Sequence, residues 1–452
     1  MQNTNLPKSN HLKKVLGVAF GLAVVVGSTI GVGILRTPGS IAALLPNATL
    51  IISCWTAIGL YILLAASSYA ELTTMLPKAG GAYNYIKRAF GNYAGFINGW
   101  FDFICNAIAP AYFCIVLGEY SILIFPEMAG YDKPIALCFL TLFALINLPG
   151  VNSGSWTQKI TSTIKIILFL VLIVGCFSHH SALQPANTKQ TIVVGSGLLI
   201  ALFKSLQLIM GTYDGWMSVS FFAEEDSDPN KNIPKSYLIG ALTIGVLYVL
   251  INAAILYVLP VDEIAKSPLA ASDAASVAFG KWSGTLMTAV AIFSLVSILN
   301  AYMMIPSRIL YGMGRDGFFI KQSTVVNKGG TPYYSLLICY AFAFVLVLFS
   351  SFEALFGLAT FMMTFVTGFA FASLIMLRKK EPDLFRPYRA FGYPFTTWLA
   401  LIVTIALFIG FAFSDTTSLL IVLGIILLSY IGYRMFVRNN DDNSNNTTDF
   451  NA

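Results

Sequence analysis

Charged residues and histidines are scarce in this chain. Of its 452 residues, 11% are Asp, Glu, Lys or Arg, 3 are histidine and 57% are hydrophobic. Charged residues make up about a quarter of a typical soluble domain, so this composition cannot supply a water-facing surface. Apolar stretches of about 18 residues or more, long enough to cross a bilayer, recur along the whole length. The composition therefore excludes a soluble protein and predicts an all-α integral membrane protein.

Motifs of catalysis and metal binding are missing as well. The sequence contains no His-Glu-x-x-His, no Gly-x-Ser-x-Gly and no phosphate-binding loop, so we expect neither an enzyme nor a bound metal or cofactor. It also lacks a filter-like loop of the kind that ion channels use. The cysteines lie in apolar stretches without metal-ligand spacing, which is typical of free thiols acting as small hydrophobic residues. They are Cys54, Cys105, Cys114, Cys138, Cys176 and Cys339.

The apolar sequence divides into twelve runs. A polar segment, Met1 to Asn10, leads into the first run without a small-residue cleavage site, so we expect no cleaved signal peptide. Several runs exceed the ~20 residues that a helix needs to cross a bilayer, which favours tilted or broken helices. The runs are residues 12–45, 48–75, 91–125, 135–149, 160–178, 192–223, 236–260, 284–314, 333–351, 353–377, 394–413 and 417–437.

The distribution of basic residues predicts the orientation. With the N-terminus in the cytoplasm, 19 of the 27 Lys and Arg residues fall in inner loops and tails. Only four, Lys133, Lys189, Lys266 and Lys281, fall in outer loops. Because cytoplasmic loops carry an excess of Lys and Arg, we expect both termini on the cytoplasmic side of the cytoplasmic (plasma) membrane.

Two glycine-rich segments interrupt long apolar runs. They are Gly27-Ser28-Thr29-Ile30-Gly31-Val32-Gly33, followed by Pro38, and Gly211-Thr212-Tyr213-Asp214-Gly215. An unwound backbone in hydrocarbon costs several kcal/mol for each unpaired group, so it persists only where protein, water or a ligand pairs with it. Broken helices at matching places in two halves of a chain indicate a transporter's substrate site.

The matching breaks predict an internal repeat of five helices. Because five is odd, the second repeat must be inverted in the bilayer. We expect the following divisions: 1–11 as a cytoplasmic N-terminus, 12–178 and 192–377 as the two repeats, 394–437 as two additional helices, and 438–452 as a disordered cytoplasmic tail.

The two breaks together suit a zwitterion. The half-helix that starts near Gly33 offers free amides and a positive dipole end to a carboxylate, and the half that ends near Thr29 offers carbonyls to an ammonium. The second break repeats this arrangement, and a polar residue beside it, Asp214, is expected either to cap a half-helix or to serve the substrate. Asn300 is a further candidate contact to the substrate, with an interhelical hydrogen bond as the alternative.

Four separated motifs resemble those of the amino acid–polyamine–organocation superfamily, near the bacterial relatives of L-type amino acid transporters and serine/threonine exchangers. The motifs are Gly27 to Pro38, Pro77-Lys-Ala-Gly-Gly-Ala-Tyr-Asn-Tyr85, Tyr213-Asp-Gly-Trp216 with Phe222-Ala-Glu-Glu225, and Arg308-Ile-Leu-Tyr-Gly-Met-Gly-Arg-Asp-Gly317. The resemblance covers nearly the whole chain in register. It implies 12 transmembrane helices in a LeuT-like 5+5 inverted repeat, discontinuous helices 1 and 6, and alternating access around a midplane amino acid site.

The resemblance also implies which positions bind substrate. The residues carried over are Thr29, Gly31, Val32, Gly33, Gly211, Tyr213 and Asp214. The sequence departs from the family pattern twice. Val32 replaces a serine often found between the two glycines, and Gly211 stands where many relatives carry a bulky aromatic that caps the substrate. The second departure leaves the outer-gate residue open.

Lys165 is expected to couple transport to a cation. It matches a lysine of sodium-independent relatives, where the ammonium resembles a substitute for sodium. A lysine buried among carbonyls could bind and release a proton during transport. A lysine that snorkels to the cytoplasmic surface is one alternative. A sodium site that includes Ser294 and Ser297 is another.

Further charged residues are expected to serve coupling or gating. Asp102 lies near mid-bilayer, where a carboxylate needs a partner, and it is either a coupling group or a structural one. Glu224 and Glu225 follow the second break among basic inner loops, and could pair with Lys13, Lys14, Arg308 or Arg315 to hold a cytoplasmic gate shut; a solvated charge run is the alternative. Arg36 either attracts an anionic substrate or pairs with an outer acidic residue.

Together these features predict a secondary active transporter of α-amino acids, most simply neutral ones. We expect it to be sodium-independent and to work as a proton symporter or an amino acid exchanger. The alternatives are a sodium-coupled carrier, a carrier of cationic or acidic amino acids or polyamines, and a non-transporting amino acid sensor. Heteromeric relatives attach to a glycoprotein through a cysteine in the outer loop that corresponds to Pro126–Lys133, which has none here. We therefore expect a monomer or non-covalent dimer with no disulfide-linked subunit, in contact with lipid but not with nucleic acid.

Overall fold

The computed structural model describes residues 14–448 apart from 15, 180–195, 268 and 281. Over that range the structure is helical, and the one β-bridge joins Leu16 to Asp226. Its first elements are α1 (Val18–Thr29), α2 (Val32–Leu44), α3 (Ala48–Met75), α4 (Tyr83–Phe90), α5 (Asn92–Ile124), η1 (Pro126–Met128), α6 (Asp132–Asn147) and α7 (Val151–Ser178). The remaining ones are α8 (Ser196–Tyr213), η3 (Ser218–Glu225), α9 (Pro229–Val258), α10 (Val261–Ile264), α11 (Ala270–Phe279), α12 (Trp282–Arg315), η4 (Lys321–Thr324), α13 (Tyr333–Phe349), α14 (Phe352–Lys380), α15 (Phe395–Ser414) and α16 (Thr416–Thr448).

Nine segments within the described residues are long and apolar enough to cross a membrane, and α13 is a shorter apolar helix. The protein is therefore a multi-pass membrane protein. The segments are Val18–Leu44, Ala48–Met75, Asn92–Ile124, Lys159–Ser178, Pro229–Val258, Trp282–Arg315, Ala354–Lys380, Phe395–Ser414 and Thr416–Met435. The sequence predicted twelve; the three others correspond to α6, α8 and α13, with 16, 18 and 17 residues. Each is shorter than the ~20 residues that a straight crossing needs.

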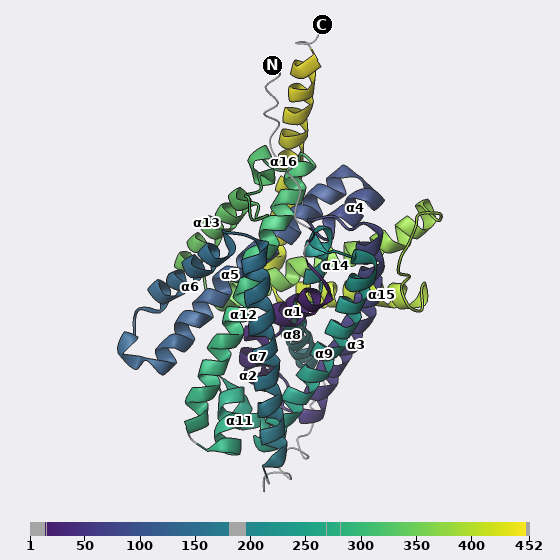
Figure 1. Ribbon diagram of the computed structural model, residues 1–452. Coiled ribbons are helices and arrows are strands. Elements are labelled where there is room, and N and C mark those ends of the chain that lie inside the picture. The colour runs from purple at the N-terminus through teal and green to yellow at the C-terminus, as the bar shows by residue number, and fades with distance from the viewer. Residues whose placement is uncertain (1–13, 15, 180–195, 268, 281, 449–452) are drawn as a thin grey trace.

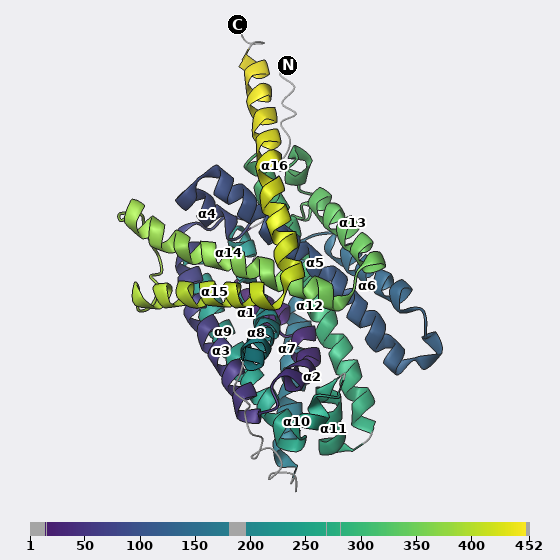
Figure 2. The same ribbon diagram turned by 180° about the vertical axis from the view of Figure 1, so that it is seen from behind.

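The broken segment α1–α2 lies at the centre of the molecule. α1 packs against α7, α9 and α12, and α2 packs against α8. α3 and α9 run side by side along one flank in both views (Figures 1 and 2). α14 contacts α5, α8 and α15. Since other helices surround α1 and α2 on several sides, polar groups at their break meet protein rather than lipid.

Both predicted interruptions are present as breaks in helix. α1 ends at Thr29 and α2 begins at Val32, with Ile30 in an extended conformation and Gly31 between them. α8 ends at Tyr213 and a turn leads into η3. In that turn Gly215 has φ = +103°, a conformation that a side chain disfavours. Residue type at these positions thus dictates where the helices stop.

The C-terminal helix α16 continues through Thr448 and projects beyond the body of the molecule in both views (Figures 1 and 2). The prediction of disorder over 438–452 differs from this up to residue 448. Extending an existing helix adds one hydrogen bond for each residue fixed, so polar residues can follow an apolar span without a new nucleation step. The predicted N-terminal segment 1–11 and residues 449–452 lie outside the described residues.

A buried carboxylate anchors the loop between α14 and α15. Glu71, on α3, has no solvent exposure and accepts two hydrogen bonds of 2.7 Å from Arg378. Arg386, also buried, lies 3.3 Å from the same carboxylate. The backbone amide of Ala390 donates a further bond of 2.6 Å to it. Three hydrogen bonds and the Arg386 charge, all from α14 and the following loop, therefore converge on one side chain of α3.

We expect Glu71→Gln to destabilise the protein strongly. Removing one partner of a buried ion pair costs about 3–5 kcal/mol, because the remaining charges stay buried. The matched control is Glu381→Gln, which breaks a half-exposed pair with Arg88 at 2.7 Å; such pairs contribute about 0–1 kcal/mol. Thermal unfolding of the purified protein in detergent measures both variants. Equal losses would contradict the anchoring role of Glu71.

Candidate functional site

The carbonyls at the end of α1 are paired with a lysine from α7. The Nζ atom of Lys165 donates to the Gly27 carbonyl at 2.9 Å and also to the Ile30 carbonyl. The Lys165 side chain has no solvent exposure, so it does not snorkel to a surface in this conformation. Ser294 of α12 donates to the same Ile30 carbonyl at 3.2 Å. The ammonium therefore lies among backbone carbonyls, as the sequence predicted for a cation-coupling lysine.

Tyr248 of α9 links the two breaks. Its hydroxyl lies 2.7 Å from the Thr29 carbonyl and 3.1 Å from the Thr212 carbonyl. A hydroxyl has one proton, so it can donate to only one of the two carbonyls at a time. Ser28 adds a second link, with Oγ 3.0 Å from the Gly215 carbonyl and 2.9 Å from Ser218 Oγ. A change in backbone conformation at one break therefore alters hydrogen bonds at the other.

The N-terminus of α2 has no side-chain cap. Gly31 precedes the helix, Val32 is its first residue, and among the described residues no side-chain cap is found at this helix end. The first amides of a helix have no partner within it. Gly33 lies against α8: a Cβ atom there would lie 2.7 Å from Thr212 Oγ1 and 2.8 Å from Thr212 Cα. Glycine therefore brings these uncapped amides directly against the second break.

Three predicted residues of the second break have different environments. Asp214 accepts from the amide of Gly215 at 2.9 Å and from the Tyr302 hydroxyl at 3.2 Å, so its side chain fixes the turn; the N-cap of the following η3 is Met217. Tyr213 directs its hydroxyl to the Trp55 carbonyl at 3.3 Å. Gly211 lies against α14, and its carbonyl accepts from the Asp214 amide at 3.2 Å. For Tyr213, only main-chain atoms remain as candidates for contact with a substrate.

Asn300 and Asp102 are both fully buried. The Oδ1 atom of Asn300 accepts from Asn147 of α6 at 3.0 Å, which is the interhelical alternative considered for it. Asp102 accepts from Asn106 at 2.9 Å through Oδ1, while its Oδ2 atom has no hydrogen-bond partner within the described residues and faces the backbone at Gly81. Asp102 is therefore a buried acceptor with spare capacity.

The predicted gating residues form two ion pairs between η3 and α12. Arg308 donates to Glu225 at 2.8 Å, with both side chains buried. Arg315 makes a two-pronged contact with Glu224 at 2.7 and 2.8 Å. Burial raises the pKa of the Glu225 carboxyl, and the Arg308 charge opposes that rise. Arg308 thus stabilises the ionised form of the buried Glu225 carboxyl.

The residues just before α1 pair with the segment that contains Glu224 and Glu225. Leu16 donates its amide to the Glu225 carbonyl at 3.0 Å and accepts from the Ser227 amide at 2.8 Å. α1 is therefore held to η3 by main-chain pairing beside the two ion pairs. Lys13 lies outside the described residues, and Lys14 is exposed.

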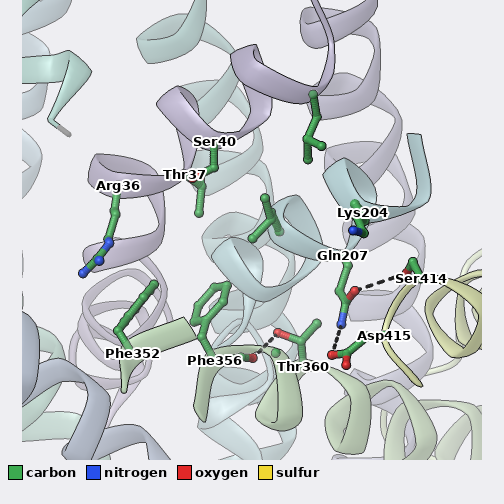
Figure 3. Close-up of a pocket in the computed structure, with 13 residues that line it drawn as sticks. Arg36, Thr37, Ser40, Lys204, Gln207, Phe352, Phe356, Thr360, Ser414 and Asp415 are labelled. Atoms are coloured by element: carbon green, nitrogen blue, oxygen red, sulfur yellow. Dashed lines mark hydrogen bonds between the residues drawn. The ribbon is translucent and has the colours of Figure 1, made fainter. Parts of the chain in front are cut away.

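A cavity of about 260 Å³ opens at the opposite end of α2 (Figure 3). Residues of α2, α8 and α14 line it, together with Ser414 at the end of α15 and Asp415 after it. Arg36, at its edge, pairs with Glu119 of α5 at 2.7 Å and lies over the Phe352 ring, 4.4 Å from its centroid. Arg36 thus takes the second of its two predicted roles, pairing with an acidic residue. Gln207, on the cavity wall, lies 3.4 Å from Asp415 and 3.5 Å from Ser414.

Sequence reasoning missed Tyr248 and Phe356. Tyr248 lies in an apolar run with no neighbouring motif, and its signal, one hydroxyl within a span, is weak without knowledge of which carbonyls are free. Phe356 is one of many phenylalanines in the apolar sequence; it packs on Gly211, the position whose missing side chain the sequence did flag.

Comparisons with known proteins agree with this arrangement. The model of the amino acid permease family matches residues 18–431. The chain is 28% identical over 403 residues to the serine/threonine exchanger SteT of Bacillus subtilis (strain 168), covering 87% of this chain and 90% of the exchanger. It is 27% identical to the human b(0,+)-type amino acid transporter 1 (85% and 80% covered) and 27% identical to the human cystine/glutamate transporter (84% and 77% covered).

The family match spans most of the chain and both helix breaks. Each of these relatives is named as a transporter or exchanger rather than an enzyme. The uncapped helix end, the paired carbonyls and the membrane-crossing helices fit the same activity. The chain belongs to the amino acid permease family.

Proposed function

We propose that this protein moves α-amino acids across the cytoplasmic membrane by alternating access, independently of sodium, and that its two helix breaks form the substrate site. The observation that carries the proposal is the N-terminus of α2, a helix end inside the protein without a side-chain cap and directly beside the second break. Free amides with a positive dipole end suit a carboxylate. Broken helices in two halves of a transporter are typical of substrate sites.

In this proposal the main chain binds the parts common to all α-amino acids. The amides of Gly31, Val32 and Gly33 take the carboxylate. The carbonyls of Thr29 and Gly211 take the ammonium. Each of these carbonyls already accepts one hydrogen bond from the protein, and a carbonyl oxygen has a second lone pair. These main-chain contacts do not distinguish one amino acid side chain of the substrate from another.

Lys165 is the proposed coupling group. Its ammonium lies at the Gly27 and Ile30 carbonyls, where it leaves little room for a sodium ion at the same oxygens. Release of a proton from Lys165 would remove two charged hydrogen bonds from the end of α1 and so loosen the break. Asp102, with its unpartnered Oδ2, is the second candidate for proton exchange. Lys165 would suit either proton symport or amino acid exchange, so it does not separate the two.

The order of helix lengths supports two inverted repeats, 12–178 and 192–377, followed by two additional helices in 394–437. After each break come helices of 28 and 30 residues (α3, α9), 33 and 34 (α5, α12), 16 and 17 (α6, α13), and 28 and 29 (α7, α14). Packing repeats too: α7 contacts α1 and α12, as α14 contacts α8 and α5. We propose twelve crossings in a LeuT-like arrangement.

Orientation and assembly follow from charge. Ion pairs are formed by four residues that the distribution of basic residues places in the cytoplasm: Lys87, Arg88, Arg315 and Arg378. We propose that these residues lie at the cytoplasmic face and that both termini lie there. The protein is proposed to act without a disulfide-linked subunit.

The proposed substrates are neutral amino acids, because the residues around the breaks are largely apolar or hydroxylic. A cationic substrate is the second candidate, since Asp102 and Asp214 bring two buried carboxylates near the breaks without a basic side chain bonded to either. Competition of serine and lysine for uptake separates the two.

We expect Lys165→Ala to lower uptake of labelled neutral amino acids into proteoliposomes by at least about tenfold. Two hydrogen bonds from a charged donor are lost, each contributing about 1.5–3 kcal/mol, and 1.4 kcal/mol is tenfold. Residual uptake should no longer respond to pH. The control Lys159→Ala, an exposed lysine on the same helix, should behave as wild type.

Sodium, a proton gradient and internal amino acid are varied separately in that assay. Stimulation by internal amino acid identifies an exchanger, and stimulation by the proton gradient identifies a symporter. Sodium-dependent uptake that Lys165→Ala leaves unchanged would contradict the proposal and move coupling to Ser294 and Ser297.

We expect Arg308→Ala to favour the inward-open state and Arg315→Ala to do so less. Arg308 pairs with Glu225 inside the protein, where loss of one partner costs about 3–5 kcal/mol, whereas the more exposed Arg315 pair contributes about 1 kcal/mol or less. The measurement is the external concentration that half-saturates uptake, which should rise more for Arg308→Ala. A larger rise for Arg315→Ala would contradict this account of the gate, and gel filtration checks that each variant folds.

A further inference from the structure

The 260 Å³ cavity beside Arg36 lies on the side that the proposed orientation places outside the cell, and we call it the outer cavity. Aromatic rings form its floor. Phe356 of α14 lines the cavity yet is only 5% exposed, so most of its ring lies below the cavity, within the protein. Phe352, one helical turn earlier, stacks on it at 5.1 Å between centroids. Tyr112 of α5 meets both rings edge-on, at 5.6 and 5.8 Å. Figure 3 shows Phe352 and Phe356 side by side beneath Arg36 and Thr37.

The ring of Phe356 sits in a notch on α8. A Cβ atom on Gly211 would lie 2.8 Å from both Cε1 and Cζ of this ring, closer than real Cβ contacts. The same Cβ would overlap Thr360, one turn further along α14. The absent side chain of Gly211 is therefore the space that Phe356 occupies.

This notch adjoins the second helix break. Gly211 is three residues before Asp214, and its carbonyl accepts the Asp214 amide. Thr212, the next residue, contacts Gly33 at the start of α2. Phe356 thus lies between the outer cavity on one side and the backbone of both breaks on the other.

We propose that Phe356 is the outer gate: its ring closes the path from the outer cavity to the helix breaks by seating in the notch at Gly211. This inference rests on the proposed function for its direction of transport. The seat is bare backbone, so the ring can leave it without disengaging an interlocked side chain of α8. Phe352 and Tyr112 hold the ring in the closed position through edge and stacking contacts.

The gate is tested without a substrate, by modification of Cys105. This buried thiol lies on α5, about two turns inward of Tyr112. A membrane-impermeant thiol reagent is added from outside, and peptide mass spectrometry assigns the modified cysteine. Phe356→Ala should raise the rate at Cys105 by about tenfold, because each lost aromatic contact shifts an opening equilibrium severalfold. Phe361→Ala removes the same ring from a position of α14 that faces Phe408 of α15, and should leave the rate unchanged.

A swap of the aromatic side chain makes the test specific. Gly211→Phe alone should abolish uptake, since two rings then compete for one space. The double variant Gly211→Phe/Phe356→Ala should return both the Cys105 rate and the uptake toward wild type. Additive loss in the double variant, or equal labelling of Phe356→Ala and Phe361→Ala, would overturn the proposal. Phe356→Leu, with a smaller change in volume, gives an intermediate rate if Phe356→Ala folds poorly.

The two proposals fail separately. Wild-type protein that does not take up amino acids, but whose Cys105 labelling follows this pattern, would overturn the proposed function and retain the gate. Amino acid uptake by the wild-type protein, together with Cys105 labelling that Phe356→Ala does not change, would overturn the gate and retain the proposed function.

Discussion

The pairing of backbone groups at the two breaks is the constraint on which the rest of the structure depends. In a membrane protein, a carbonyl or amide outside a helix has no water to bond, and leaving it unpaired costs several kcal/mol. Here Lys165, Tyr248 and Ser294 reach from three helices to the carbonyls of Gly27, Thr29 and Ile30. These three hydrogen-bond donors lie on α7, α9 and α12. The same three helices pack against α1, so the pairing of the carbonyls also determines which helices surround α1. The amides at the N-terminus of α2 differ, because no side chain caps them. Such a helix end can bind an anionic group of a ligand.

The two ends of this centre are closed by different physical interactions. At one end, ion pairs of Arg308 and Arg315 hold η3 to α12, and main-chain pairing holds Leu16 to η3. At the end that lines the cavity, aromatic rings of α14 and α5 pack on one another beside Gly211. Buried ion pairs are strong only with good geometry, whereas aromatic contacts are individually weak and tolerant of movement. If the protein works by the proposed alternating access, opening at the two ends has different energetic requirements.

How far the sequence predicts this arrangement depends on the kind of signal. Both helix breaks could be predicted from the glycines within apolar runs. Glycine contributes no hydrophobic side chain there, so its presence indicates a special backbone conformation or a close approach of the backbone. For Lys165 the structure gives the contacts of the ammonium with the Gly27 and Ile30 carbonyls, while its coupling role stays a prediction. Asn300 was ambiguous between substrate and helix partner, and Asn147 supplies the partner. Phe356 and Tyr248 could not be selected, since their roles come from which residues of distant helices they meet. The helical extension of α16 to Thr448 depends on propagation from the apolar span rather than on local composition.

The central claim is that the main chain at the two breaks binds the amino acid. Equilibrium binding of labelled serine to the purified protein tests it most directly, comparing Gly33→Ala with Gly17→Ala. A Cβ at position 33 would overlap Thr212 and separate the breaks, whereas at position 17 the nearest atom, Ser227 Oγ, would be 4.0 Å away. The account predicts that Gly33→Ala loses at least about tenfold in affinity, equivalent to 1.4 kcal/mol, and that Gly17→Ala retains wild-type binding. Undiminished binding by a folded Gly33→Ala protein would contradict it.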